Sequence, residues 1–180
     1  VVSDGLTGGQ VVSGIGGQHN FVSQANALDD AHSILLLRSF RTSKGKATSN
    51  IVPEYGNTTV TRHFREIVIT EYGAADLRGK TDSEVILELI QIADSRFQAE
   101  LLNWAKQYGK VAADVQLAEQ YLNNTPESLA ARLTGTRELL PDFPFDCDFT
   151  DDELRLMAVL GRMQATKKPL PVLKAIYRGL

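Results

Sequence analysis

The chain has 180 residues, 43% of them hydrophobic and 23% charged, a composition that excludes collagen-like, wholly disordered and coiled-coil classes. A formal net charge of −3 argues against nucleic acid as a partner, and no apolar stretch approaches the ~20 residues of a membrane-spanning helix. Cys147 is the single cysteine, so an internal disulfide is excluded and a cytoplasmic location is expected.

Glycine is concentrated at the start of the chain, where six of the 14 glycines fall within the first 17 residues. A short strand predicted at 10–13 leads into the turn Gly14-Ile15-Gly16-Gly17, and a short helix is predicted from Ser23 to Ala31. Closely spaced glycines permit positive φ and let backbone amides approach a ligand, as phosphate cradles and oxyanion holes require. The turn does not complete a dinucleotide fingerprint, and a tight strand-to-helix connection is the alternative interpretation.

Two apolar runs predict strands. Residues 33–37 form a continuous apolar run, which is typical of a strand buried on both faces. Residues 66–70 include three successive β-branched residues and predict a central strand. Between them, Lys44-Gly45-Lys46 is a predicted turn, and the extended stretches 49–52 and 58–62 predict a β-hairpin.

Glu71 follows the predicted central strand, at the end where open α/β sheets gather their ligands. The carboxylate is therefore placed for chemistry, and the alternative is a helix cap or an ion pair with Arg78 or Lys80. The turn Lys44-Gly45-Lys46 suits contact with phosphates, and the alternative is a solvated hairpin tip. The three histidines are too dispersed along the chain to predict a metal site.

Helical periodicity begins after residue 80. Thr81 and Glu84 form a predicted capping box, and Asp94 is predicted to cap a second helix that Gly109 ends. Residues 111–180 predict a helical extension, with helices starting near 125 and 150 and a loop at 140–149 that must pack on something. Its acidic stretch, 142–153, and its basic stretch, 161–180, suit pairing with each other or with another chain.

Three motifs occur in an order that resembles one family. They are 14–21 (GIGGQHNF), 44–46 with 51–53, and 70–80 (TEYGAADLRGK). Together they resemble the C-terminal domain of acetyl-CoA hydrolases and acetate- or 4-hydroxybutyrate-type CoA-transferases, over about residues 3–108. This resemblance implies an α/β fold of the NagB/RpiA/CoA-transferase type, a central β-sheet flanked by helices, over residues 1–110 and truncated at its N-terminus. The helical extension then spans residues 111–180.

The resemblance also implies an enzyme, an acyl-CoA hydrolase or CoA-transferase that works through a glutamyl-CoA thioester. The nucleophilic glutamate is expected upstream of this chain, in the N-terminal half of the same polypeptide, so the chain alone is expected to be inactive. Gly16 and Gly17 would supply an oxyanion-hole amide, and Glu71 would be an active-site carboxylate. The Glu-x-Gly form of 71–73 leaves a nucleophilic role for Glu71 open.

Contacts with coenzyme A are implied for Lys44, Lys46 and Gln18, with the thioester as substrate and no permanently bound cofactor. A homodimer is expected, without a nucleic acid or membrane partner. Asn20 departs from the family pattern, where an aspartate usually precedes the phenylalanine. A nucleotide- or phosphate-binding or regulatory module without catalysis is the alternative to the enzyme, and Glu71 discriminates the two, since a binding module has no need of it.

Overall fold

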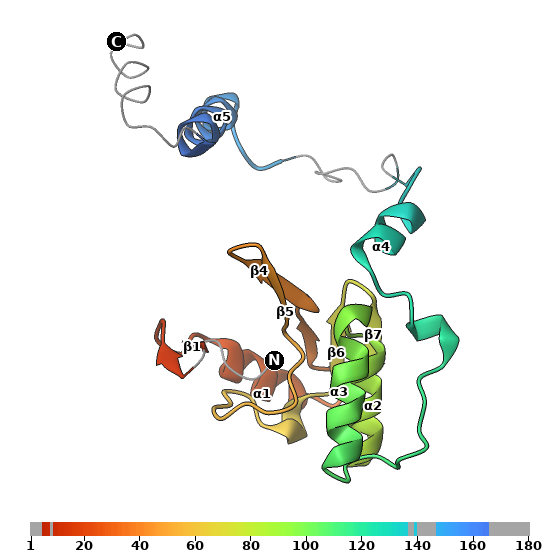
Figure 1. Cartoon of the computed structure of the whole chain (residues 1–180). Helices are drawn as coiled ribbons and strands as arrows, with labels where there is room; N and C mark the ends of the chain where they lie inside the picture. The colour runs from red at the N-terminus through yellow and green to blue at the C-terminus, as the bar shows by residue number, and fades with distance from the viewer. Residues whose placement is uncertain (1–4, 8, 137–138, 140–146, 166–180) are drawn as a thin grey trace. The chain divides into compact units, whose positions relative to one another are not determined.

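The computed structural model describes residues 5–7, 9–136, 139 and 147–165. The chain divides into two compact units, Val1–Thr134 and Gly135–Leu180, which are treated separately below (Figure 1). Within the described ranges, no helix combines the length and the apolar character needed to cross a membrane.

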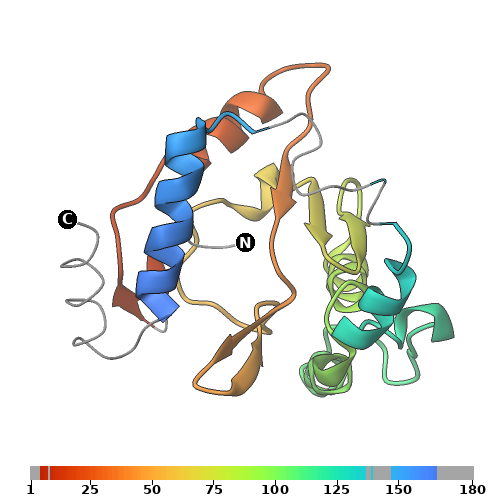
Figure 2. The same cartoon turned by 90° about the horizontal axis from the view of Figure 1, so that it is seen from above.

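A three-stranded sheet forms the centre of the first unit, in the order β3 (Ile34–Leu36), β6 (Ile67–Thr70) and β7 (Gly73–Asp76) (Figure 2). Strands β3 and β6 are parallel, with Leu35 opposite Val68, whereas β6 and β7 form an antiparallel hairpin. The predicted central strand is therefore confirmed. Its β-branched side chains suit a position with neighbours on both edges.

The prediction that residues 33–37 are buried on both faces is wrong. Leu35 is 5% exposed, but Ile34 is 50% exposed and Leu36 is 74% exposed. Strand β3 lies at the edge of the sheet, and only its Leu35 face meets the core. Apolar residues on the outer face conceal the alternation that a half-buried strand normally shows.

The predicted hairpin is also displaced. Strand β4 (Phe40–Ser43) pairs with β5 (Lys46–Ser49), and Lys44 and Gly45 form the turn with φ of 50° and 77°. Two positive φ values give the tight turn whose twist matches that of the flanking strands. The stretch 58–62 forms no strand and leads instead into the 3-10 helix η1 (Arg62–Phe64).

At the N-terminal end, β1 (Leu6–Thr7) pairs with β2 (Gln10–Val11), which confirms extended structure before the glycine turn. The following helix, α1, spans Gln18–Asn26 rather than the predicted 23–31. It begins directly after the turn because the backbone of Gly17, at φ −76° and ψ 1°, already approaches helical geometry.

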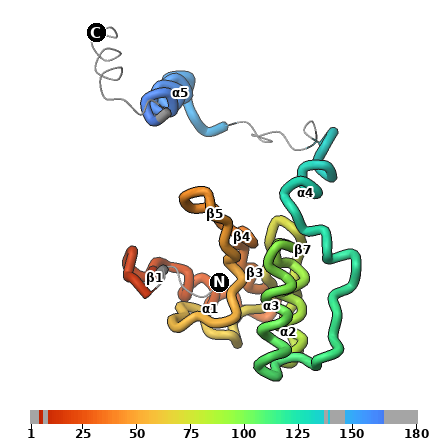
Figure 3. Tube along the Cα trace, viewed as in Figure 1, coloured from red at the N-terminus to blue at the C-terminus, as the bar shows by residue number. Residues whose placement is uncertain are grey.

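Helices α2 (Asp82–Gln91) and α3 (Ser95–Gln107) pack against each other, and α2 also contacts β7 (Figure 3). The predicted capping box is confirmed: the Thr81 N–H donates to Glu84 Oε2 at 2.8 Å, and the Glu84 N–H donates to Thr81 Oγ1 at 3.4 Å. Asp94 caps α3 by accepting the Arg96 N–H at 3.0 Å. Gly109, at φ 64°, follows the end of α3 as predicted.

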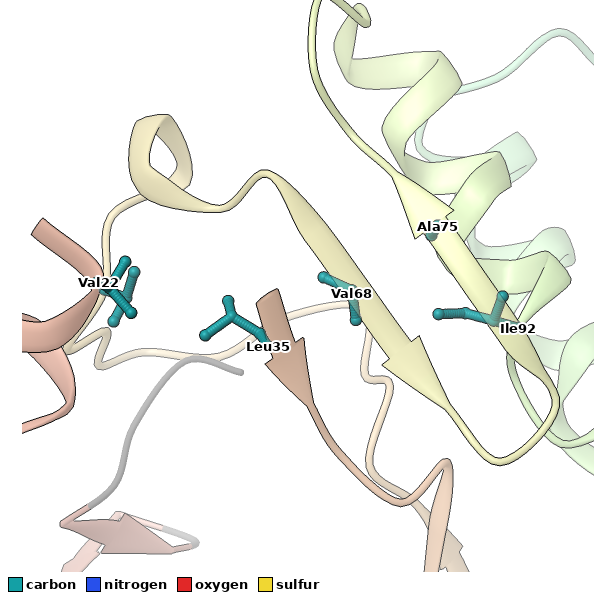
Figure 4. Packing of buried hydrophobic residues seen from close by; sticks show 6 residues of the cluster. Val22, Leu35, Val68, Ala75 and Ile92 are labelled. Carbon is teal, nitrogen blue, oxygen red and sulfur yellow. The ribbon is translucent and has the colours of Figure 1, made fainter. Parts of the chain in front are cut away.

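The core of the first unit runs from α1 across the sheet to the end of α2. Figure 4 shows Val22, Leu35, Val68, Ala75 and Ile92, all buried and all in one cluster. Because these side chains come from four elements and the turn after α2, the cluster holds the sheet between α1 and the α2–α3 pair.

The segment after α3 is tied back to the first unit by buried amides. Asn124 donates from Nδ2 to the Gln91 and Ala93 carbonyls at 2.7 and 3.0 Å, and Gln98 donates from Nε2 to the Tyr121 carbonyl at 3.0 Å. These bonds keep η2 (Glu119–Tyr121) in the first unit, and α4 (Pro126–Arg132) follows with Pro126 in its first turn, as predicted. The boundary predicted at residue 110 for the family domain stays a prediction.

The second unit contains α5 (Asp151–Ala165). Its predicted capping box is confirmed, since the Thr150 N–H donates to Glu153 Oε2 at 2.8 Å and the Glu153 N–H donates to Thr150 Oγ1 at 3.4 Å. Most of the loop predicted at 140–149, namely 140–146, and most of the basic stretch lie outside the described residues.

We expect Thr81→Ala to lower the free energy of unfolding by about 1 kcal/mol, because it removes the hydroxyl that satisfies a first-turn amide of α2. Urea unfolding of the chain measures this change. Thr58→Ala is the matched control, since Thr58 is exposed and lies outside the regular elements, and it should leave the midpoint unchanged. Equal midpoints for the two variants would show that the capping box contributes nothing.

Candidate functional site

The glycine turn lies on the surface. Gly14, Gly16 and Gly17 are exposed, and none of them has positive φ, so the expected left-handed backbone is not what they provide. Small size matters at Gly17, where a Cβ would lie 3.0 Å from Cε2 of Phe21, whereas a Cβ on Gly14 would meet nothing within 4 Å. The turn leads into the first amides of α1, and no acidic residue occupies the first turn of that helix. The amide-rich end of α1 is therefore uncompensated by side-chain charge.

Gln18, the first residue of α1, carries a buried side-chain oxygen. Its Oε1 has no hydrogen-bond partner within the part of the chain that the structure describes. A buried amide oxygen without a donor costs free energy, so it favours a bound donor. The sequence singled out Gln18 as a coenzyme A contact, and this geometry leaves it able to accept a hydrogen bond.

Glu71 is held by a residue that sequence reasoning missed. Its Oε2 accepts the Ser39 N–H at 2.8 Å, and its Oε1 accepts the Ser39 hydroxyl at 2.7 Å. Ser39 is fully buried, whereas Glu71 is half-buried. The carboxylate is thus fixed at both oxygens at the end of the central strand. The alternative partners Arg78 and Lys80 pair elsewhere, with Asp76 and Glu88.

Tyr72, the next residue, belongs to a polar network centred on buried Asp94. Its hydroxyl donates to Asp94 Oδ2 at 3.0 Å, and Arg96 donates to the two oxygens of Asp94 from Nε at 2.7 Å and from Nη2 at 2.8 Å. The Arg96 guanidinium lies 4.4 Å from the ring centre of Phe40, which is adjacent in sequence to Ser39. The network therefore joins the Glu71–Tyr72 turn, the Ser39–Phe40 segment and the start of α3.

The charges of this network are set by burial and pairing. Burial raises the pKa of the Tyr72 hydroxyl, and its bond to Asp94 and the nearby charges of Asp94 and Glu71 raise it further. Burial also raises the pKa of Asp94, but the bonds from Arg96 and Tyr72 outweigh burial and bring the pKa of this carboxyl below its ordinary value. Tyr72 thus stays a neutral donor and Asp94 a charged acceptor.

Lys44 and Lys46 lie at the exposed tip of the β4–β5 hairpin. Among the described residues, neither ammonium is hydrogen-bonded to Glu71, whose two carboxylate oxygens are held by Ser39. The hairpin begins at Phe40, so its base adjoins the Ser39 contact with Glu71. The exposed tip can contact an anion from solvent. The tip of any solvated hairpin has the same exposure, so the geometry does not distinguish the two interpretations.

The Ile51-Val52-Pro53 motif lines an apolar pocket of about 260 Å³ together with Trp104 and side chains of α2 and α3. Trp104 is half-buried and stacks on Tyr108 with ring centres 4.6 Å apart. Most of this lining is apolar, so the pocket suits an apolar group, although Arg62, Asp82 and Lys110 also border it. Among the residues that the structure covers, no group of three His, Cys, Asp or Glu side chains is placed to hold a metal.

The network residues that sequence reasoning missed differ in whether the sequence contains a signal for them. Tyr72 lies within the 70–80 string and Asp94 had a predicted role as a helix cap, so both were within reach of a sequence argument. Ser39, Phe40 and Arg96 lie in no motif, and only the tertiary structure places them beside Glu71 and Asp94.

Comparison with known proteins gives a family match. The sequence profile described as Acetyl-CoA hydrolase/transferase C-terminal domain matches residues 1–105. The chain is 37% identical over 95 residues to 4-hydroxybutyrate coenzyme A transferase of Clostridium kluyveri, covering 51% of this chain and 22% of that protein. It is 32% identical over 114 residues to acetyl-CoA hydrolase of Saccharomyces cerevisiae, covering 60% and 21%.

A solved structure also matches. A point-mutant structure of RipA has a TM-score of 0.53 at 33% identity, covering 58% of this chain and 23% of that one. The chain spans about a fifth of the length of the curated relatives it matches. The α/β fold of the CoA-transferase type, predicted from the three motifs, is confirmed.

Proposed function

Because the chain belongs to the acetyl-CoA hydrolase/transferase C-terminal domain family, we propose that it forms one side of the active site of an acyl-CoA hydrolase or CoA-transferase. The observation that carries this proposal is the fixed carboxylate of Glu71. Both of its oxygens are held by buried Ser39 at the end of the central strand. A phosphate-binding module without catalysis has no use for a fixed negative charge there.

The chemistry proposed is thioester exchange on a glutamate. A glutamate carboxylate oxygen attacks the carbonyl of the acyl-CoA and its C–S bond breaks, which gives a mixed anhydride and the coenzyme A thiolate. The thiolate then attacks the glutamyl carbonyl of the anhydride, which releases the acyl group as a carboxylate and leaves coenzyme A as the thioester of the glutamate. Attack of water on this thioester gives hydrolysis, and attack of an acceptor carboxylate gives transfer. The nucleophile is proposed to lie upstream of Val1, in the N-terminal half of the same polypeptide.

Gly16 and Gly17 are proposed to supply a backbone amide to the developing oxyanion, since neither residue has a Cβ atom that would keep a thioester away. Such a donor is worth about 3 kcal/mol in the transition state. Glu71 is proposed to act on the reacting thioester without becoming covalently attached. Because Ser39 already holds the carboxylate in one position, the Glu71 side chain loses little conformational entropy when the substrate binds.

Gln18, Lys44 and Lys46 are proposed as contacts for coenzyme A. Gln18 begins α1 directly after the glycine turn, and the two exposed ammonium groups suit phosphates. Coenzyme A is a substrate in this scheme, and no resident cofactor is required. A homodimer in the cytoplasm completes the proposal.

Trapping in the full-length protein tests the assignment of the nucleophile. Incubation with acyl-CoA followed by hydroxylamine or borohydride should modify a glutamate upstream of Val1, located by peptide mass spectrometry. The 180-residue chain alone should show no acyl-CoA turnover under the same conditions. Modification of Glu71 would instead make it the nucleophile, and absence of any modified glutamate in an active preparation would contradict thioester exchange.

A further inference from the structure

A polar hollow of about 390 Å³ lies at the end of the sheet where β6 begins and β7 ends. Four cationic side chains, a histidine and one carboxylate line it: Arg62, Arg65, Arg78, Lys80, His63 and Glu66. They come from η1 with the residues beside it and from the turn after β7. The two segments are joined by Arg62, whose Nη2 donates to the Lys80 carbonyl at 3.2 Å.

The cations of this hollow are unequally neutralised. Three of them pair with acids outside the lining, Arg62 with Asp82, Arg78 with Asp76 and Lys80 with Glu88. Arg65 forms no ion pair with any acid in the described ranges, and its Nε donates to the Thr61 carbonyl at 3.3 Å. Burial and the neighbouring charge of Arg62 lower the pKa of the Arg65 guanidinium. Its positive charge is therefore less stable here than in water, and a bound anion would stabilise it.

The single carboxylate of the lining is engaged elsewhere. Glu66 Oε2 accepts the Ser33 N–H at 2.6 Å and lies 3.6 Å from Nδ1 of His32. These contacts direct the carboxylate toward the start of the edge strand. Arg65 is therefore the cation of the lining that no acid among the described residues pairs with.

We propose that this hollow is a binding site for a diphosphate group, with Arg65 as its principal ligand. Guanidinium groups match phosphate oxygens with paired donors, and several cations around one space suit an anion with more than one charge. Gly79 lies in the lining at φ 66°, and no atom lies within 4 Å of where its Cβ would be, so the backbone leaves room for the ligand. The proposal does not depend on acyl-CoA chemistry, because Glu66 and Glu71 mark opposite ends of β6.

Calorimetric titration of the chain with sodium pyrophosphate at low ionic strength tests the site. We expect saturable binding at one site with a Kd below about 1 mM, which weakens as salt is added. Arg65→Met should weaken binding at least about tenfold, since it removes the unpaired guanidinium but keeps the apolar stem. Arg132→Met is the matched control, because Arg132 is exposed on α4, and it should bind as the original chain does.

A gain of affinity guards against a folding artefact. Glu66→Gln removes the one negative charge of the lining and keeps an oxygen for the Ser33 N–H, so it should tighten pyrophosphate binding about fivefold. ADP in place of pyrophosphate identifies the source of the group: equal affinity indicates a free diphosphate, and tighter binding a nucleotide. Lack of saturable binding, or affinity unchanged in both Arg65→Met and Glu66→Gln, would overturn the proposal.

Discussion

Replacing Glu71 with alanine in the full-length protein is expected to lower kcat for acyl-CoA turnover by about 10²-fold or more. The variant removes the carboxylate that Ser39 holds through its N–H and its hydroxyl, so both the charge and its fixed position are lost. Glu71→Gln separates these contributions, because the amide oxygen still accepts one bond from Ser39 while the charge is gone. Steady-state kinetics of the purified variants, with the folded fraction measured by circular dichroism, give the comparison.

Ser39→Ala tests whether the positioning of Glu71 matters by itself. The backbone N–H of residue 39 remains as a donor, so we expect a smaller loss of about tenfold, in kcat rather than in KM. Glu100→Ala is the control, since Glu100 is exposed on α3, and its kinetics should match those of the parent. If Glu71→Ala turned over acyl-CoA at the parent rate, Glu71 would be excluded from the reaction.

Asp94→Ala should be the most destabilising of the single substitutions considered, by about 3 kcal/mol. Asp94 is fully buried, caps α3 and accepts bonds from both Tyr72 and Arg96, so alanine leaves a half-buried hydroxyl and a helix end without partners. Asp94→Ser keeps a capping oxygen and should recover about 1 kcal/mol of that loss. Urea unfolding of the 180-residue chain measures both, with Asp114→Ala, an exposed loop position, as the control.

The pH dependence of stability measures the contribution of the Asp94 charge to the free energy of unfolding. Its folded-state pKa lies below the ordinary carboxyl value, so its contribution is fully present above that value and is lost as pH falls through the folded-state pKa. We therefore expect the original chain to lose more stability in acid than Asp94→Asn does. Parallel losses for the two proteins would show that the Asp94 charge contributes nothing to folding.

Local sequence patterns were sufficient for the ends of the helices that follow residue 80. The capping boxes at Thr81 and Thr150, the cap at Asp94 and the stop at Gly109 all occur as predicted, because each depends on side chains within a few residues of the backbone they satisfy. The central strand at 67–70 was predicted for a similar reason, since its β-branched side chains favour extended structure whatever their neighbours.

The errors have different causes, and one of them depends on the order of distant strands. The apolar run at 34–36 forms the edge strand of the described sheet, with β6 on one side only. Local periodicity does not predict the order of strands in a sheet, so the run alone could not show this. The hairpin was predicted from residues 49–52 and 58–62. It forms earlier in the chain instead, because the turn at Lys44 and Gly45 joins strand 40–43 to strand 46–49. The helix after the glycine turn starts earlier than predicted because Gly17 already has near-helical dihedrals.

The sequence by itself determined the family, through three motifs in order, and it predicted which glycines and which glutamate belong to the candidate site. Glycine-rich and carboxylate motifs can be recognised in a sequence because their chemistry needs particular residue types. Only the tertiary structure decided what holds Glu71, namely Ser39, 32 residues earlier in the chain. It also decided that Tyr72, Asp94, Arg96 and Phe40 form one network. Hydrogen bonds between side chains so far apart follow from packing, and no local pattern encodes them.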